Sequence, residues 1–289
     1  MPKEQLSLSF EKHTITVLHV VQGDEGRYSI EDCQTLRFPF DLYADVLEAG
    51  QSKGMLAVTN ELNPILSRFQ TSRLSVSVNM DRTKCLDTHI NRNLSPDEFA
   101  YECEDEASKF LRDPSDYNWQ SIRLKETSDA PYEKHLLVFM PKRFLTRLEM
   151  MILPCQKEIN LIDGSHMSFQ NLYRWSGERR ILIELEEHYM AISLFDQACT
   201  ESFAYWNLSS ETDAAYFTLT ELRKLDPDVP ISITGSSASR EAIQFLSSVI
   251  EKQIDPVATP NVVSAKCRVD DSPRMLKALG CAIKALSEF

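Results

Sequence analysis

The order of expected elements repeats along the chain, and this repeat constrains the fold more than any other feature. In the second half, three short β-rich runs are separated by polar, turn-like residues, which is typical of an antiparallel meander. Helices and strands then alternate to the last residue. The predicted strands are 181–185, 189–195, 200–207, 229–235 and 261–269, and the predicted helices start at Ser209 or Ser210, span 236–253 and begin again at Pro273. The second half therefore predicts the order βββαβαβα.

The first half follows the same order with one interruption. Three strands are expected over residues 5–40, with QGDEG as a hairpin turn, followed by a short helix at 41–54 and an alternating strand at 73–80. Strand, helix, strand and helix are expected again over 134–175. Residues 84–131 interrupt the repeat with an acidic helix, which opens on a Ser-Pro-Asp sequence, and with a strand at WQSIRL.

A meander followed by alternating helices and strands predicts the α/β class, with a mixed central sheet that helices cover. Two copies predict two lobes with a cleft between them. We expect a first lobe at 1–176, with an inserted subdomain at about 84–131, and a second lobe at 177–289.

Charge and cysteine content exclude several classes of function. The net charge is −12, whereas nucleic-acid and anionic-lipid binders need clustered Lys and Arg. The seven cysteines form no CxxC pair and are odd in number, which argues against zinc and disulfide frameworks and favours a reducing cytoplasm. The start has no signal-peptide core, and no apolar run approaches the roughly 20 residues that span a bilayer. We therefore expect any membrane association to go through a partner.

Glycine is scarce, which bears on nucleotide binding. The chain has 8 glycines, and none of them forms GxGxxG or GxxxxGK[ST]. Loops that wrap phosphates need glycine for positive φ and for close backbone approach. A nucleotide site of the standard glycine-rich kind is therefore not expected.

The duplicated order resembles that of the actin-like (ribonuclease H-like) ATPase superfamily, and within it the PilM and FtsA families. The resemblance covers nearly the whole chain. It is carried by the opening hairpin at LSLSFEKHTITVLHVVQGDEG, by the second hairpin at ILIELEEHYMAISL, by ISITGSSASREAIQFLSSVI and by the closing helix ALGCAIKAL. It implies two ribonuclease H-like lobes and, from PilM, a cytoplasmic scaffold or adaptor. Such an adaptor would bind a short cytoplasmic segment of a membrane protein and lie peripheral to the inner membrane, and homo-oligomerisation stays open.

The residues at the superfamily's nucleotide motifs depart from the pattern. The first hairpin carries D-x-G in these families, but Ser9-Phe10-Glu11 stands there. The second hairpin carries Glu184-Leu185-Glu186, so Glu186 replaces the glycine. At the strand–Gly-Gly–helix element, Gly235 is followed by Ser236. Each carboxylate held ~4 Å from a phosphate charge costs ~1 kcal/mol in water and several times more in a cleft. We therefore expect no cofactor, no metal and no catalysis.

Several alternatives remain open from the sequence. Glu184 could act as the metal or water ligand of a divergent Mg-dependent ATPase that binds ATP, with Gly235, Ser236 and Ser237 near the adenosine. A two-metal nuclease needs several converging carboxylates, which the first strand does not offer. The more ordinary interpretation is that Glu184 is a solvated strand-end acid and that Glu186 and Glu187 are solvated hairpin residues. Gly280 is interpreted as a close-packing position inside the last helix.

Overall fold

The computed structural model describes residues 3–81, 83–125, 131–196, 199–226 and 228–288. The chain divides into two compact units, each made of separate stretches of sequence. Unit 1 comprises Met1–Met80, Arg143–Trp175 and Ala258–Phe289, and unit 2 comprises Asp81–Lys142 and Ser176–Val257.

Unit 1 is built on a six-stranded mixed sheet with the order β14-β3-β2-β1-β4-β8. The first three strands form an antiparallel meander, and β4 and β8 continue the sheet parallel to β1. The strands are β1 (Lys3–Phe10), β2 (Thr14–Gln22), β3 (Tyr28–Arg37), β4 (Arg73–Val78), β8 (Glu158–Gly164) and β14 (Val263–Ala265). Six consecutive residues of β1 are buried, because helices cover both faces of a central strand.

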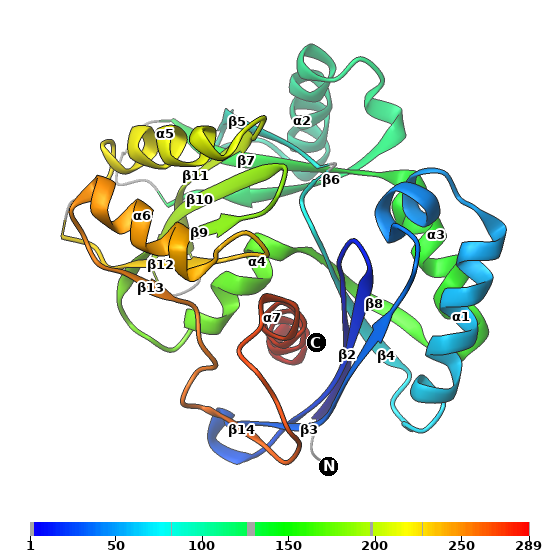
Figure 1. Cartoon of the computed structure of the whole chain (residues 1–289). Helices are drawn as coiled ribbons and strands as arrows, with labels where there is room; N and C mark the ends of the chain where they lie inside the picture. Colours follow the sequence, from blue (N-terminus) through cyan, green and yellow to red (C-terminus); the bar gives the residue numbers. More distant parts are fainter. Residues whose placement is uncertain (1–2, 82, 126–130, 197–198, 227, 289) are drawn as a thin grey trace. The chain divides into compact units, whose positions relative to one another are not determined.

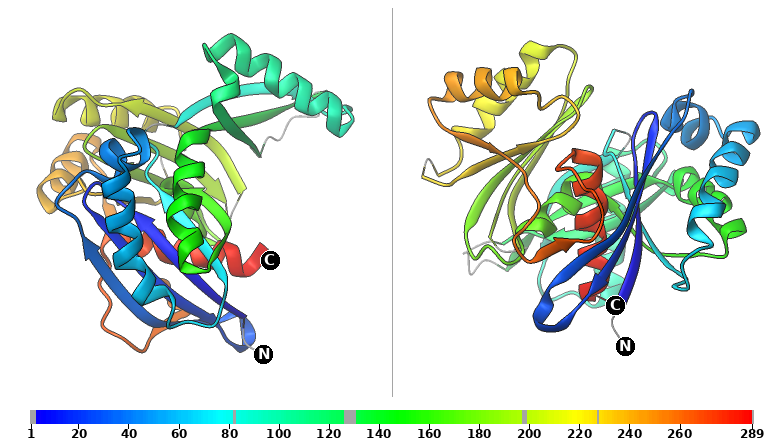
Figure 2. Two further views of the ribbon diagram at one scale, coloured as in Figure 1. Left: turned by 90° about the vertical axis from the view of Figure 1, so that its right-hand side faces the viewer. Right: turned by 60° about the horizontal axis from the view of Figure 1, so that its bottom comes forward.

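Helix α7 (Pro273–Glu288) lies against one face of this sheet, and α1 (Ser52–Leu66) and α3 (Lys142–Ile152) lie on the other (Figure 1). The right-hand view of Figure 2 shows α7 in red beside the blue hairpin of β1 and β2. The short α4 (Ser165–Gln170) packs against α7. Gly280 makes this packing possible, because a Cβ at this position would overlap the carbonyl oxygen of Ser168. The predicted close-packing role of Gly280 is confirmed.

Unit 2 contains a second mixed sheet, with the order β11-β10-β9-β12-β13. Its strands are β9 (Arg179–Leu185), β10 (Tyr189–Asp196), β11 (Cys199–Asn207), β12 (Ile231–Thr234) and β13 (Ile254–Pro256). The meander β9–β11 is antiparallel, and β12 and β13 run parallel to β9. Helices α5 (Glu211–Leu222) and α6 (Arg240–Ile250) pack apolar side chains on this sheet. The two sheets therefore share one strand order, with the meander first and two parallel strands added beside its first strand, which confirms the predicted duplication.

Unit 2 also contains a three-stranded antiparallel sheet with the order β5-β7-β6 and one helix. These elements are β5 (Lys84–Asn91), β6 (Tyr117–Arg123), β7 (Tyr132–Pro141) and α2 (Pro96–Phe110). Ser95 and Glu98 form a capping box at the start of α2. Ile90, Leu137 and Phe139 share a small core with Cys103 and Ala107 of α2.

Two segments pair differently from the sequence-based expectation. The strand expected near residue 135 for the sheet of the first lobe is β7, and it pairs with β5 and β6 instead. The strand expected over 261–269 for the second sheet is β14, and it pairs with β3 of unit 1. Helix α7 contacts β1, β2 and β4, so the end of the chain lies in unit 1, although the expected boundary at 176 assigned it to the second lobe. Residues 126–130 of the predicted insert lie outside the described residues.

Candidate functional site

The residues predicted from the nucleotide motifs lie at the carboxyl ends of three parallel strands. Ser9 and Glu11 mark the end of β1 in unit 1, Glu184 and Glu186 that of β9, and Gly235-Ser236 that of β12 in unit 2. Open α/β sheets bind ligands outside such carboxyl ends. The side chains at the carboxyl ends of β1, β9 and β12 therefore determine which ligands can bind there.

At the end of β1, the chain's own side chains hold the hairpin. Ser9 is fully buried, and its hydroxyl donates to the carbonyl oxygen of Arg274 at 2.7 Å. Phe10 is also fully buried. Glu11 follows it and accepts from the Lys277 ammonium, with 3.1 Å between Nζ and Oε1. Glu11 is thus neutralised by a cation from α7.

Lys277 also joins the ends of two neighbouring strands. Its side chain is fully buried, and its Nζ donates to Oδ1 of Asn79, just after β4, at 2.6 Å. The ammonium lies 5.9 Å from the centroid of the Phe169 ring. A buried ammonium needs such partners, because burial without them disfavours its charge strongly. Lys277 therefore connects β1 and β4 at the edge where a ligand would bind.

Tyr43 makes a second link between the same two strands. Its hydroxyl donates to the carbonyl oxygen of Phe10 at 2.9 Å and accepts from the backbone N–H of Asn79 at 2.6 Å. Tyr43 lies in a single π-helical turn, Leu42–Glu48, whose first amides are capped by the Asp41 carboxylate. The Phe10 carbonyl and the Asn79 N–H at this edge are therefore bonded within unit 1.

In unit 2, Glu184 is buried and not solvated as expected. Its exposed fraction is 0 %, and the Tyr189 hydroxyl donates to Oε1 at 2.9 Å. The expectation was wrong because Glu184 lies in β9, the middle strand of its sheet, where it is paired with Ala191 of β10 and with Thr234 of β12. The neighbouring Glu187 is exposed, as predicted.

Glu186 is also buried, at 5 % exposure, so the prediction of a solvated hairpin residue is wrong for it. Its carboxylate accepts from the backbone N–H of Ser236 at 3.2 Å and from the Ser236 hydroxyl. The β12–α6 turn approaches the hairpin closely, because the N–H of Ser237 donates to the carbonyl oxygen of Leu185 at 3.1 Å. Gly235 permits this approach, since its φ is +112° and a Cβ would overlap the backbone of Leu185.

This geometry determines what each edge can do. The Ser236 N–H, which stands at the turn before α6, donates to a carboxylate of the chain itself. Among the residues that the structure describes, no group of three or more His, Cys, Asp and Glu side chains could hold a metal ion. The Asn79 N–H, just after β4, likewise donates to Tyr43, so neither of these two amides is available to a phosphate.

Sequence reasoning missed Lys277, Asn79 and Tyr43. One signal was present: Lys277, Cys281 and Lys284 follow helical spacing inside an otherwise apolar stretch, so one face of α7 carries a fully buried lysine and a partly buried one. Lys284 pairs with the buried Asp163 at 3.0 Å. Burial alone would lower the pKa of Lys284, but the Asp163 carboxylate more than reverses this and raises it. The acidic partners could not be found from sequence, because they are far away along the chain.

Two sheets with this shared strand order, each covered by helices, define the actin-like ATPase fold. By structure, the chain is similar to the protein in a PilM–PilN type IV pilus biogenesis complex, with a TM-score of 0.76, 12% identity and 98% of each chain covered. It is also similar to a protein of Bacteroides thetaiotaomicron with an actin-like ATPase fold and unknown function, with a TM-score of 0.55 and 14% identity over 88% of this chain and 90% of that one.

A third similar structure is the cytoplasmic domain of EpsL, an inner membrane component of the type II secretion system of Vibrio cholerae. Here the TM-score is 0.53 and the identity 8%, over 99% of this chain and 97% of that one. By sequence, the chain matches no family model and no curated protein. The similar structures confirm the fold expected from the resemblance. No helix in the described part of the chain is long and apolar enough to cross a membrane.

Proposed function

We propose that this protein is a non-catalytic adaptor with the actin-like fold, which binds a protein partner at the cytoplasmic face of a membrane assembly. One observation carries the proposal. At the end of β12, the Ser236 N–H and hydroxyl donate to Glu186, so an internal carboxylate holds the donors that a phosphate would need.

The edge of unit 1 supports the same proposal. Lys277 donates to both Glu11 and Asn79 there, and a nucleotide would have to break these bonds before it gained any of its own. Breaking a buried ion pair by removing one partner costs about 3–5 kcal/mol. That is a large fraction of the roughly 8 kcal/mol that a micromolar affinity represents.

The comparisons support the adaptor part of the proposal. The structure with a TM-score of 0.76 comes from a complex of PilM with PilN, and the EpsL domain comes from an inner membrane component of a secretion system. By analogy, the partner of this chain is a short cytoplasmic segment of a membrane protein.

The test is calorimetric titration with Mg·ATP and with Mg·ADP up to millimolar concentration. We expect no saturable heat. Saturable micromolar binding that Glu184→Gln abolishes would favour the alternative, a divergent Mg-dependent ATPase. Glu187→Gln is the matched control, because Glu187 lies in the same hairpin and is exposed.

The adaptor role is tested separately from nucleotide binding. Tagged protein is incubated with detergent-solubilised membranes and with the soluble fraction of the same cells, and retained proteins are compared at matched total protein. Reproducible enrichment of one membrane protein, through its cytoplasmic segment, is expected. Self-association as the sole interaction, measured by light scattering, would contradict the adaptor and favour a purely oligomeric role.

A further inference from the structure

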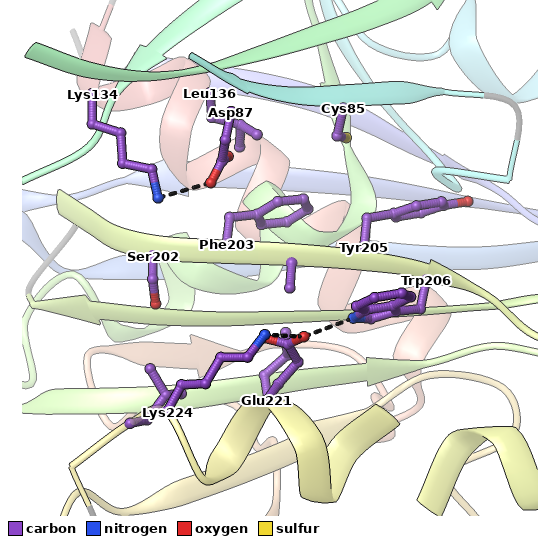
Figure 3. A pocket seen from close by; sticks show the side chains of 13 residues that line it. Cys85, Asp87, Lys134, Leu136, Ser202, Phe203, Tyr205, Trp206, Glu221 and Lys224 are labelled. Carbon is purple, nitrogen blue, oxygen red and sulfur yellow. Dashed lines mark hydrogen bonds and ion pairs between the residues drawn. The ribbon is translucent and has the colours of Figure 1, made fainter. Parts of the chain in front are cut away.

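Unit 2 contains a cavity of about 470 Å³ that the nucleotide motifs do not use. One wall is a face of the three-stranded sheet, where Cys85 and Asp87 of β5 and Lys134 and Leu136 of β7 point toward the cavity (Figure 3). The opposite wall is β11, and α5 with the turn after it closes one side. All these elements belong to unit 2. The volume falls within the range of ordinary ligand sites, about 300–1,000 Å³.

The cavity lies along the outer edge of β11. Phe203 and Tyr205 point to one side of this strand and Ser202 and Trp206 to the other, as Figure 3 shows, and all four line the same cavity. Successive side chains of a strand point to opposite faces of the sheet, so only a space beside the strand can touch both sets. The inner side of β11 is occupied by β10, and β11 is the last strand of its sheet. The cavity therefore lies beside the other edge of β11, its outer edge.

The outer edge of β11 already pairs with extended chain at its beginning. The backbone N–H of Lys125, just after β6, donates to the carbonyl oxygen of Thr200 at 2.8 Å. This bond shows that the edge accepts hydrogen bonds from a neighbouring backbone. Residues 202–206, which line the cavity, continue the same edge for a length of about 13 Å at ~3.3 Å per residue.

The charged side chains of the cavity neutralise one another. Lys134 pairs with Asp87 at 2.8 Å, and Lys224 pairs with Glu221 at 2.8 Å. Glu221 also accepts from the indole N–H of Trp206 at 3.1 Å. A charged ligand group would have to compete with these pairs, whereas an uncharged one would not. Leu136, Ile192 and Leu225 supply apolar lining.

We propose that the cavity binds an extended, uncharged segment of a protein partner, which adds as a strand to the outer edge of β11. In this mode, backbone hydrogen bonds to the edge strand give affinity, and alternate side chains enter pockets on either side. Apolar side chains of the segment would contact Leu136 on one side and Trp206 on the other. This inference rests on the proposed adaptor function and identifies a site for its partner.

The experiment uses the full-length protein and a synthetic library of acetylated and amidated peptides of about seven residues, close to the mode of strand length. Each position varies among Val, Leu, Phe, Tyr, Ser, Thr and Asn, so that every member is uncharged and apolar side chains can lie on both sides of the strand. Binding is measured by fluorescence anisotropy, and the location is measured by amide hydrogen exchange. We expect selected members to bind saturably and to slow exchange in residues 199–207.

A backbone scan tests the strand geometry directly. Each position of the best peptide is N-methylated in turn. Positions whose N–H faces β11 should lose affinity about tenfold, and the alternate positions should lose little, because only every second N–H of a strand faces its neighbour. A loss at every position, or at none, would contradict strand addition.

Ser202→Trp fills the cavity and should abolish peptide binding. Gln120→Trp is the matched control, since Gln120 is an exposed residue of the edge strand β6 and is not among the residues that line the cavity. Unchanged melting temperatures show that both variants are folded. Absence of binding by every library member up to millimolar concentration overturns this site, as does equal binding by wild type and Ser202→Trp. If a membrane protein partner binds Ser202→Trp as tightly as wild type, this site is wrong and the adaptor function stands.

Discussion

Lys277 of α7 and Glu11 at the end of β1 form an ion pair whose two members differ in burial. The ammonium has no exposed surface, whereas the Glu11 side chain keeps 20% of its surface exposed. Their charges lie 266 positions apart in the sequence and hold the last helix of the chain to its first strand. The pair therefore contributes to the stability of unit 1. The same two side chains occupy the edge at the end of β1 where a ligand would bind.

This asymmetry predicts unequal effects of removing each partner. Glu11→Gln removes a counter-charge from a fully buried ammonium, and it should lower the free energy of unfolding by up to about 3–5 kcal/mol. Lys277→Met leaves a carboxylate that water can reach, so the loss should be smaller, about 1–3 kcal/mol. Urea unfolding of both variants and of the double variant measures the two losses and their coupling. A coupling energy near zero would show that the pair is not energetically linked.

Glu186 is predicted to hold the β12–α6 turn against the β9–β10 hairpin. Glu186→Ala removes the charged acceptor for the N–H and hydroxyl of Ser236, and hydrogen bonds to a charged group contribute about 1.5–3 kcal/mol. Amide exchange of residues 235–239 should therefore become faster. Glu187→Ala, at the exposed neighbouring position, serves as the control and should leave this exchange unchanged. Equal exchange rates in both variants would contradict the role given to Glu186.

The sequence predicted most of the helices and strands, but it did not predict the burial and the partners of the site residues. The meanders, α5 with its cap at Ser210 and the β12 strand lie where periodicity and turn chemistry put them, because these signals are local. Strand pairing is not local, so β7 and β14 were assigned to the wrong sheets. The buried state of Glu184 and Glu186 was missed for a related reason. A carboxylate is expected in water unless its partners are known, and Tyr189 and Ser236 become partners only when the chain has folded.

Two helical glycines offer a matched test of close packing. Gly280→Ala would put a methyl group into the carbonyl oxygen of Ser168, which is backbone of another helix and cannot move aside easily. A loss of about 3 kcal/mol or more is expected, at the upper end of overpacking effects. Gly54→Ala in α1 meets only a side-chain methyl of Val46 at 3.0 Å, and the better helix propensity of Ala offsets this contact. Its stability should stay within about 1 kcal/mol of wild type. Similar losses in the two variants would mean that α7 and α4 are not packed as closely as described.

The lowered pKa of His135 predicts that the stability of unit 2 depends on pH. His135 lies in β7, and its Nδ1 is 2.8 Å from the Ser121 hydroxyl. Burial lowers the pKa of His135, Glu133 raises it in part, and Arg123 adds to the lowering. The folded pKa is thus below the unfolded value of ~6.5, so the unfolded chain takes up the proton first as the pH falls. The contribution of His135 is complete above the unfolded pKa and declines as the pH falls toward and through the folded one.

His135→Gln removes this titration and retains a group that can bond to Ser121. Urea midpoints are measured for both proteins at about pH 8 and about pH 5.5, on either side of the ordinary histidine pKa. Wild type should lose more stability than His135→Gln over this range, because every other titrating group is common to both. An equal loss in the two proteins would show that His135 titrates with the same pKa in the folded and unfolded states.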